Sequence, residues 1–80
     1  MIDDDLVRVA ADAIMRYLHS HPHSADTVEG IHEWWIDWPS MPESLTITHI
    51  ALVRLEAAGL LECRRVSNRE VWRLRQSQSD

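Results

Sequence analysis

Residues 54–61 read Arg54-Leu55-Glu56-Ala57-Ala58-Gly59-Leu60-Leu61, and the hydrophobic pattern changes its period across them. Before Gly59, apolar residues recur three and four positions apart, as on one face of a helix. After it they alternate with polar residues, as on a strand. Glycine readily adopts the left-handed conformation that commonly follows the last turn of a helix. We therefore expect a helix to end at Gly59 and a strand to follow it directly.

The helix that leads to Gly59 is expected to begin near Thr46. The Thr46 hydroxyl can cap the first turn, and Leu45 and Ile50 occupy the positions of a hydrophobic staple. Helical spacing directs five residues inward: Thr48, Ala51, Leu52, Leu55 and Ala58. It leaves five others facing outward: His49, Val53, Arg54, Glu56 and Ala57.

The chain after Gly59 is predicted to form a β-hairpin. Two runs with period-two alternation, residues 60–66 and 70–74, flank the polar turn Ser67-Asn68-Arg69. Trp72 and Leu74 share one face of the second run. The opposite face carries Val71, Arg73 and Arg75.

A first helix is predicted over residues 6–18, where the apolar positions with helical spacing are Leu6, Val9, Ala10, Ala13, Ile14, Tyr17 and Leu18. It is expected to end within residues 19–23, because Pro22 cannot continue the backbone hydrogen bonding. Histidines at 19, 21 and 23, with His32 further along, are ligand types that suit zinc or nickel. A polar loop interrupted by proline is the simpler interpretation, and we expect no metal site.

A second helix is expected from Asp26, which has capping-box spacing to Glu29, to about Asp37. A projection at about 100° per residue places its apolar residues within an arc of about 120°, namely Val28, Ile31, Trp34, Trp35 and Trp38. This stripe is interpreted as core. Residues 39–42, with a proline at each end, are expected to form an ordered turn.

Two residues of this second helix are candidates for an exposed apolar interface. Trp34 lies at the edge of the arc, and Ile36 lies on the opposite side, beside His32. Tryptophan is enriched in protein interfaces because it buries a large area while keeping a polar group. The alternative is that Trp34 is one more core residue in a chain that has no phenylalanine.

Length and charge limit the kinds of function to consider. The chain has 80 residues and a net charge of -5. Residues 1–43 are acidic, with nine acids and two arginines. Residues 44–80 are basic, with four acids and six arginines. A chain this short buries only about 60% of its unfolded surface, so it builds one core. We expect one domain over residues 1–75 and a polar tail over 76–80. An acidic protein can bind nucleic acid only through a local basic patch.

Cellular location is also constrained. Cys63 is the single cysteine, no apolar run approaches the ~18 residues of a membrane span, and residues 1–5 resemble no signal peptide. We therefore expect a cytoplasmic protein without a membrane partner. No catalytic triad motif is recognisable, and two glycines do not make a phosphate-binding loop. We expect no enzymatic activity and no cofactor.

Three helices and a hairpin, with the sequence RLEAAGLL closing the third helix, resemble the winged helix-turn-helix family. The likeness covers residues 6–75. It implies an α+β fold of three helices followed by a two-stranded hairpin, the wing. It also implies that the third helix enters the DNA major groove and that the wing contacts the backbone.

Two functional hypotheses stay open on these residues. A DNA-binding transcription regulator, acting as a homodimer, would use Thr48, His49 and Arg54 on the third helix and a basic wing made of Arg64, Arg65, Asn68, Arg69 and Arg73. A protein-interaction module would instead dock its partner on the apolar positions Ile50 and Val53 of the same helix. The wing arginines would then meet acidic groups, or lie in solvent paired with Glu62 or Glu70. The acidic charge and the apolar third helix favour the interaction module slightly.

Overall fold

The computed structural model describes residues 3–38 and 43–75. In chain order its elements are α1 (Asp4–Ser20), β1 (Ala25–Asp26), α2 (Val28–Gly30), the π-helical turn η1 (Ile31–Trp35), α3 (Leu45–Ala57), β2 (Leu61–Val66) and β3 (Arg69–Leu74). Since η1 continues α2 directly, these ranges hold three helical segments and one antiparallel sheet with the strand order β1-β3-β2. The α+β class is as predicted, and the layout is compatible with a winged helix. The predicted tail and the turn at residues 39–42 lie outside the described residues.

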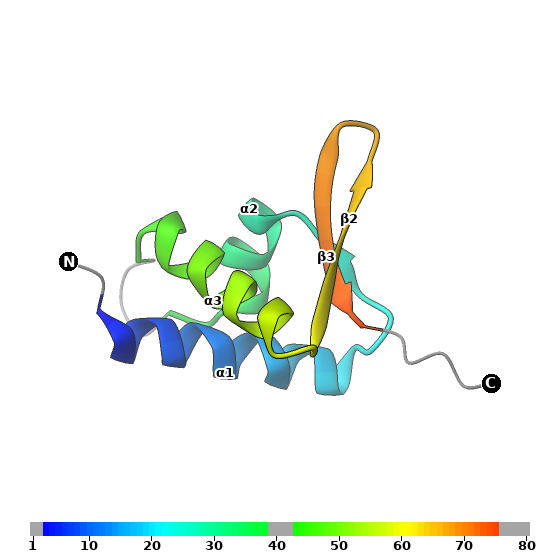
Figure 1. Ribbon diagram of the computed structural model, residues 1–80. Helices are drawn as coiled ribbons and strands as arrows, with labels where there is room; N and C mark the ends of the chain where they lie inside the picture. The colour runs from blue at the N-terminus through cyan, green and yellow to red at the C-terminus, as the bar shows by residue number, and fades with distance from the viewer. Residues whose placement is uncertain (1–2, 39–42, 76–80) are drawn as a thin grey trace.

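The hairpin stands at one end of the helices. Figure 1 shows α1 and α3 lying along each other, with β2 and β3 rising beside the C-terminal end of α3 and extending beyond the helices. Strands β2 and β3 pair from Leu61 opposite Leu74 to Val66 opposite Arg69. The lower half of the hairpin packs on the core, whereas its upper half is exposed.

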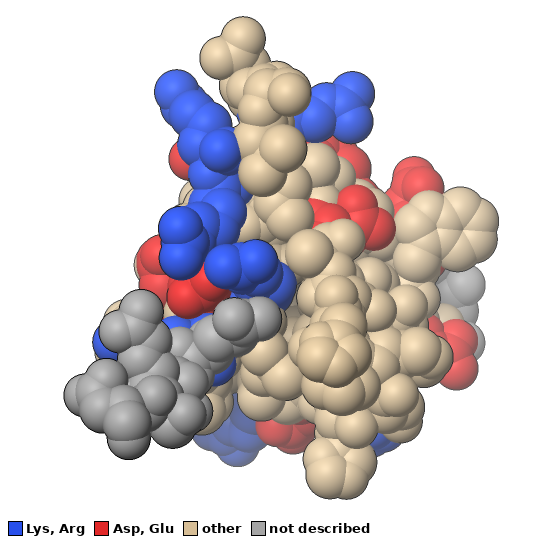
Figure 2. Space-filling model, turned by 90° about the vertical axis from the view of Figure 1, so that its right-hand side faces the viewer, with Lys and Arg blue, Asp and Glu red and all other residues tan. Residues whose placement is uncertain are grey.

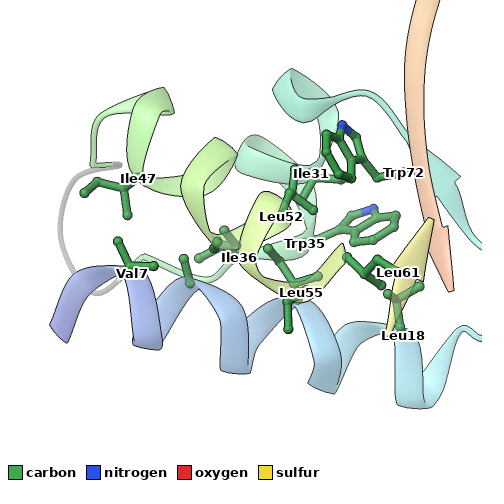
Figure 3. Close-up of a cluster of buried hydrophobic side chains, with 13 residues drawn as sticks. Val7, Leu18, Ile31, Trp35, Ile36, Ile47, Leu52, Leu55, Leu61 and Trp72 are labelled. Carbon is green, nitrogen blue, oxygen red and sulfur yellow. The ribbon is translucent and has the colours of Figure 1, made fainter. Parts of the chain in front are cut away.

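The core is built from every layer of the fold. Val7 of α1 and Ile47 of α3 lie at the end of the core away from the hairpin, and Leu18, Trp35 and Leu61 lie beside the hairpin (Figure 3). Val7, rather than the predicted Val9, faces inward, because Val7 continues the spacing of the other buried α1 residues, Ala10, Ile14 and Leu18.

A short strand, β1, was missed by the sequence pattern. Asp26 pairs with Trp72 in the sheet instead of capping the second helix, so the sheet has three strands rather than two. The cap is Thr27, whose hydroxyl accepts a hydrogen bond from the Gly30 amide at 3.3 Å. Two residues are too few to show an alternating pattern.

The second helix ends at Trp35, before the expected Asp37. Ile36 has an extended backbone, with φ -110° and ψ 125°, and its side chain turns back into the core. The prediction that Ile36 forms an exposed apolar spot is therefore wrong. A projection at 100° per residue assumes a regular α-helix through Asp37. It fails here because η1 is wider than an α-helix and because the helical segment ends at Trp35, before Ile36.

The start of α3 also differs from the prediction. Ser44 is the N-cap, and its hydroxyl accepts a hydrogen bond from the Thr46 amide at 3.2 Å. Leu45 becomes the first helical residue and is exposed, so it does not hold the staple position proposed for it with Ile50. At the other end Ala58, expected to be inward, is exposed.

The junction at Gly59 is confirmed. Gly59 has a φ of +82°, its amide donates to the Glu56 carbonyl at 2.9 Å, and the Leu60 amide donates to the Leu55 carbonyl at 3.0 Å. These two bonds form a Schellman motif, which satisfies the last carbonyls of the helix and reverses the chain. The Leu60 carbonyl then accepts from the Arg75 amide at 3.0 Å, so the chain enters the sheet at once.

The hairpin closes through two left-handed residues, Ser67 at φ 50° and Asn68 at φ 66°. Two such residues between paired strands make a type I′ turn, whose twist suits a two-residue hairpin. Arg69, predicted in the turn, is the first residue of β3.

Replacing Gly59 by alanine is expected to lower the free energy of unfolding by about 1 kcal/mol, because a left-handed backbone is costly for a residue with a Cβ. The nearest atom to an added Cβ is a terminal nitrogen of Arg75 at 3.5 Å, so the cost is in the backbone alone. Thermal unfolding should show Tm lowered by about 4–8 °C. Gly59→Asn is the control and should lose less, because asparagine tolerates this conformation. An unchanged Tm for Gly59→Ala would contradict the assignment.

Candidate functional site

Thr48, one of the candidate DNA-contacting residues of α3, does not lie on the outward face of the helix. Thr48 is fully buried, and its Oγ1 lies 2.6 Å from Nδ1 of the buried His32 in a hydrogen bond. Thr48 is therefore unable to contact a base, because its place on the inward stripe commits the hydroxyl to the core. The expectation that Thr48 is a binding residue is wrong.

The remaining α3 candidates form a mixed surface. His49 is exposed and lies edge-on to the Trp72 ring, with the ring centroids 6.2 Å apart. Val53 is 43% exposed, and Ile50 is partly buried against the core. Arg54 is exposed but donates to Asp4 Oδ1 at 2.9 Å, so a carboxylate of α1 neutralises it.

The candidate wing residues divide between two faces of the hairpin. Paired residues of antiparallel strands share a face, and successive residues alternate. The outer face thus carries Glu62, Arg64 and Val66 on β2 opposite Arg73, Val71 and Arg69 on β3. Arg65 lies on the inner face with Glu70, beyond the part of that face that packs on the core.

Glu62 contacts two of the wing arginines and offsets one of their two positive charges. Its Oε2 accepts from Arg73 Nε at 2.6 Å and from Arg64 Nε at 3.3 Å. The hydrogen bond from Arg73 is the main reason that the pKa of Glu62 lies below its ordinary value. The cross-strand pairing with Glu62 that the sequence suggested is found for Arg73, whereas Arg64 contacts Glu62 along its own strand. Figure 2 shows most of the basic side chains along one side of the hairpin, with carboxylates beside them, and a further basic group on its other side.

A groove of about 730 Å³ runs between the inner side of the hairpin and the start of α2. Its lining residues come from both sides: Thr27, Val28 and Glu29, and Arg65, Asn68, Arg69, Glu70 and Trp72. The sequence pattern did not indicate this groove. The side formed by Thr27, Val28 and Glu29 is positioned by the pairing of β1 with β3, which was not predicted. The groove carries both signs of charge.

Trp34 is separated from the other tryptophans of its helix. It is 76% exposed, whereas Trp35 is buried and stacks on Tyr17 with the ring centroids 4.7 Å apart. Trp38 is partly buried and its Nε1 donates to the His32 carbonyl at 2.9 Å. The prediction that all three face the core is wrong for Trp34. Its exposure agrees with the interface hypothesis, while its role stays a prediction.

Cys63 and the histidines supply no built chemical site. Cys63 is half-buried opposite Trp72, and burial raises the pKa of its thiol. Within residues 3–38 and 43–75, no three or more His, Cys, Asp or Glu side chains are grouped to hold a metal ion. In the same ranges, no helix has the length and apolar character needed to cross a membrane.

Replacing Thr48 by valine is expected to lower the free energy of unfolding by about 1–3 kcal/mol, because His32 would be left buried without its hydrogen-bond partner. Thr46→Val is the matched control. Thr46 lies on the same helix but is exposed, so its loss should stay within about 0.5 kcal/mol. Urea denaturation of both variants measures the difference. Equal losses would mean that the bond between His32 and Thr48 contributes nothing specific.

The described surface thus offers four features that a ligand could contact. They are the paired arginines, the exposed Val53 on α3, the exposed Trp34 and the groove beside the hairpin. Neither a family model, nor a curated protein, nor a solved structure matches the chain.

Proposed function

We propose that the chain is a non-enzymatic winged-helix recognition module that docks a protein partner. The observation that carries this proposal is the pairing of its arginines. Arg54, Arg64 and Arg73 each donate to a carboxylate within 3.3 Å. A phosphate backbone is bound mainly by cationic side chains that release its counterions, and a carboxylate beside a guanidinium offsets part of the charge that the phosphate would meet.

The face of α3 supports the same proposal. Its central exposed residue is Val53, and Thr48 is committed to the core. Direct readout of bases needs donors and acceptors on this face, of which His49 is the best placed. An apolar position surrounded by polar residues is instead typical of a protein interface.

The partner implied by this surface has two chemical features. An apolar side chain of the partner would cover Val53, and acidic groups would meet Arg65 and Arg69 in the upper part of the hairpin. Among the described residues, neither of these arginines has a carboxylate within ion-pair distance. Both line the groove beside α2, so a protruding acidic segment of the partner has a place to bind.

The alternative function is DNA binding by a transcriptional regulator, and one observation favours it. Asn68 and Arg69 lie at the end of the hairpin, where a wing can reach a phosphate or the minor groove. Among the described residues, three arginines of the hairpin and its C-terminal end have no carboxylate within ion-pair distance, namely Arg65, Arg69 and Arg75. Three such cations still give only weak counterion release.

Binding to duplex DNA separates the two functions. At physiological salt we expect affinity no tighter than the nonspecific range of about 10⁻⁴–10⁻⁶ M, measured by fluorescence anisotropy, and no change in Arg54→Ala. Binding of a defined sequence tighter than about 10⁻⁷ M, lost in Arg69→Ala and in Arg54→Ala, would establish the regulator instead.

The protein interface is tested with a pair of valines. Val53→Asp should abolish binding of the purified partner, because a buried unpaired carboxylate is costly. Val9→Asp is the matched control, since Val9 is 50% exposed on α1 and belongs to no part of the proposed surface. Equal binding by both variants would exclude the α3 face.

A further inference from the structure

Among the described residues, one edge of the sheet has no neighbouring strand. In the order β1-β3-β2, the strand β2 has β3 on one side and no strand on the other among the described residues. The Arg75 amide donates to the Leu60 carbonyl, so the backbone of Leu60 faces β3. In an antiparallel pair, successive residues direct their backbone amides and carbonyls alternately toward the partner strand and away from it. The amides and carbonyls of Leu61, Cys63 and Arg65 therefore face away from β3.

The side chains on the outer face of this edge follow a symmetric pattern. Reading every second residue, they are Leu60, Glu62, Arg64 and Val66, which is apolar, acidic, basic and apolar. Leu60 is 45% exposed and Val66 is 55% exposed, so both apolar ends of the pattern lie in solvent.

We propose that β2 pairs antiparallel with β2 of a second copy of this chain, with the two-fold axis at Cys63. In this register Glu62 lies opposite Arg64 of the second copy, and Leu60 lies opposite its Val66. Opposite charges at directly opposed positions stabilise a sheet, and the two exposed apolar residues cover each other. The amides and carbonyls of Leu61, Cys63 and Arg65 that face away from β3 would form hydrogen bonds with those of the second copy. The joined sheet would then have six strands.

The neighbouring two-fold registers are disfavoured by charge. An axis at residue 62 would oppose two glutamates, and an axis at residue 64 or 65 would oppose two arginines. Like charges directly opposed destabilise a sheet. Charged residues commonly protect an edge strand from pairing with arbitrary strands. Among the registers with an axis at residues 62 to 65, the two signs of charge therefore favour the one at Cys63.

The shape of the molecule leaves room for this pairing. The hairpin extends beyond the helices, as Figure 1 shows. Antiparallel pairing about Cys63 places the two helical bodies at opposite ends of the joined sheet. The contact leaves Val53 free and shares only Arg65 with the groove beside α2, through its backbone, so dimerisation and the proposed docking of a partner can be tested separately.

Sedimentation equilibrium over a concentration series up to about 1 mM tests the association. We expect a reversible monomer–dimer equilibrium for the native sequence and a monomer for Arg64→Glu, in which two glutamates would oppose each other twice. Arg69→Glu is the matched control, because it makes the same change of charge on the same face of the hairpin, but on β3. It should dimerise like the native chain, and thermal melts establish that both variants fold.

Amide hydrogen exchange identifies the surface used. Protection that increases with concentration should appear at the amides of residues 61, 63 and 65. A native chain that stays monomeric up to about 1 mM overturns the proposal. A dimer that survives Arg64→Glu, or whose added protection lies on α3, overturns it equally. In that last case the failure concerns this edge alone and leaves the proposed docking of a partner open.

Discussion

The backbone hydrogen bond from Leu60 to Leu55, closed around the left-handed Gly59, is the constraint on which the arrangement of helices and sheet depends. It ends α3 and turns the chain so that Leu61 enters the core within two residues of Gly59. The hairpin register then carries Trp72 into the same core, where it lies against His49. An uncapped or longer helix would shift β2, and a shift of one residue exchanges the inner and outer faces of the hairpin.

Periodicity in the sequence was sufficient for the long elements. It predicted α1, most of the second helical segment, α3 and the hairpin, because each has enough residues to show a repeat of 3.6 or 2. Its errors came from short or irregular features. β1 has two residues, and the second helical segment departs from α-helical spacing at η1 and ends before Ile36, which reversed the predicted exposure of Ile36. No pattern within a single segment could indicate these departures.

The candidate surface was harder to predict than the fold, because side-chain pairing depends on contacts between distant residues. Arg54 is neutralised by Asp4 from the first turn of α1, and His32 binds Thr48 from another helix. Glu62 and Arg73 meet only once the register of the hairpin is known. Composition shows how many arginines the chain has, but only the structure shows which of them lie beside a carboxylate.

The pairing of β1 with β3 also has a consequence for the order in which the chain folds. Asp26 meets Trp72 across most of the sequence, whereas β2 and β3 are joined by two residues. Contacts between distant segments carry a larger loop-closure cost, so they slow folding more than local ones. We expect the hairpin to form before β1 pairs with it. Substitutions in β1 would then mainly accelerate unfolding and leave the refolding rate unchanged, which stopped-flow kinetics can measure.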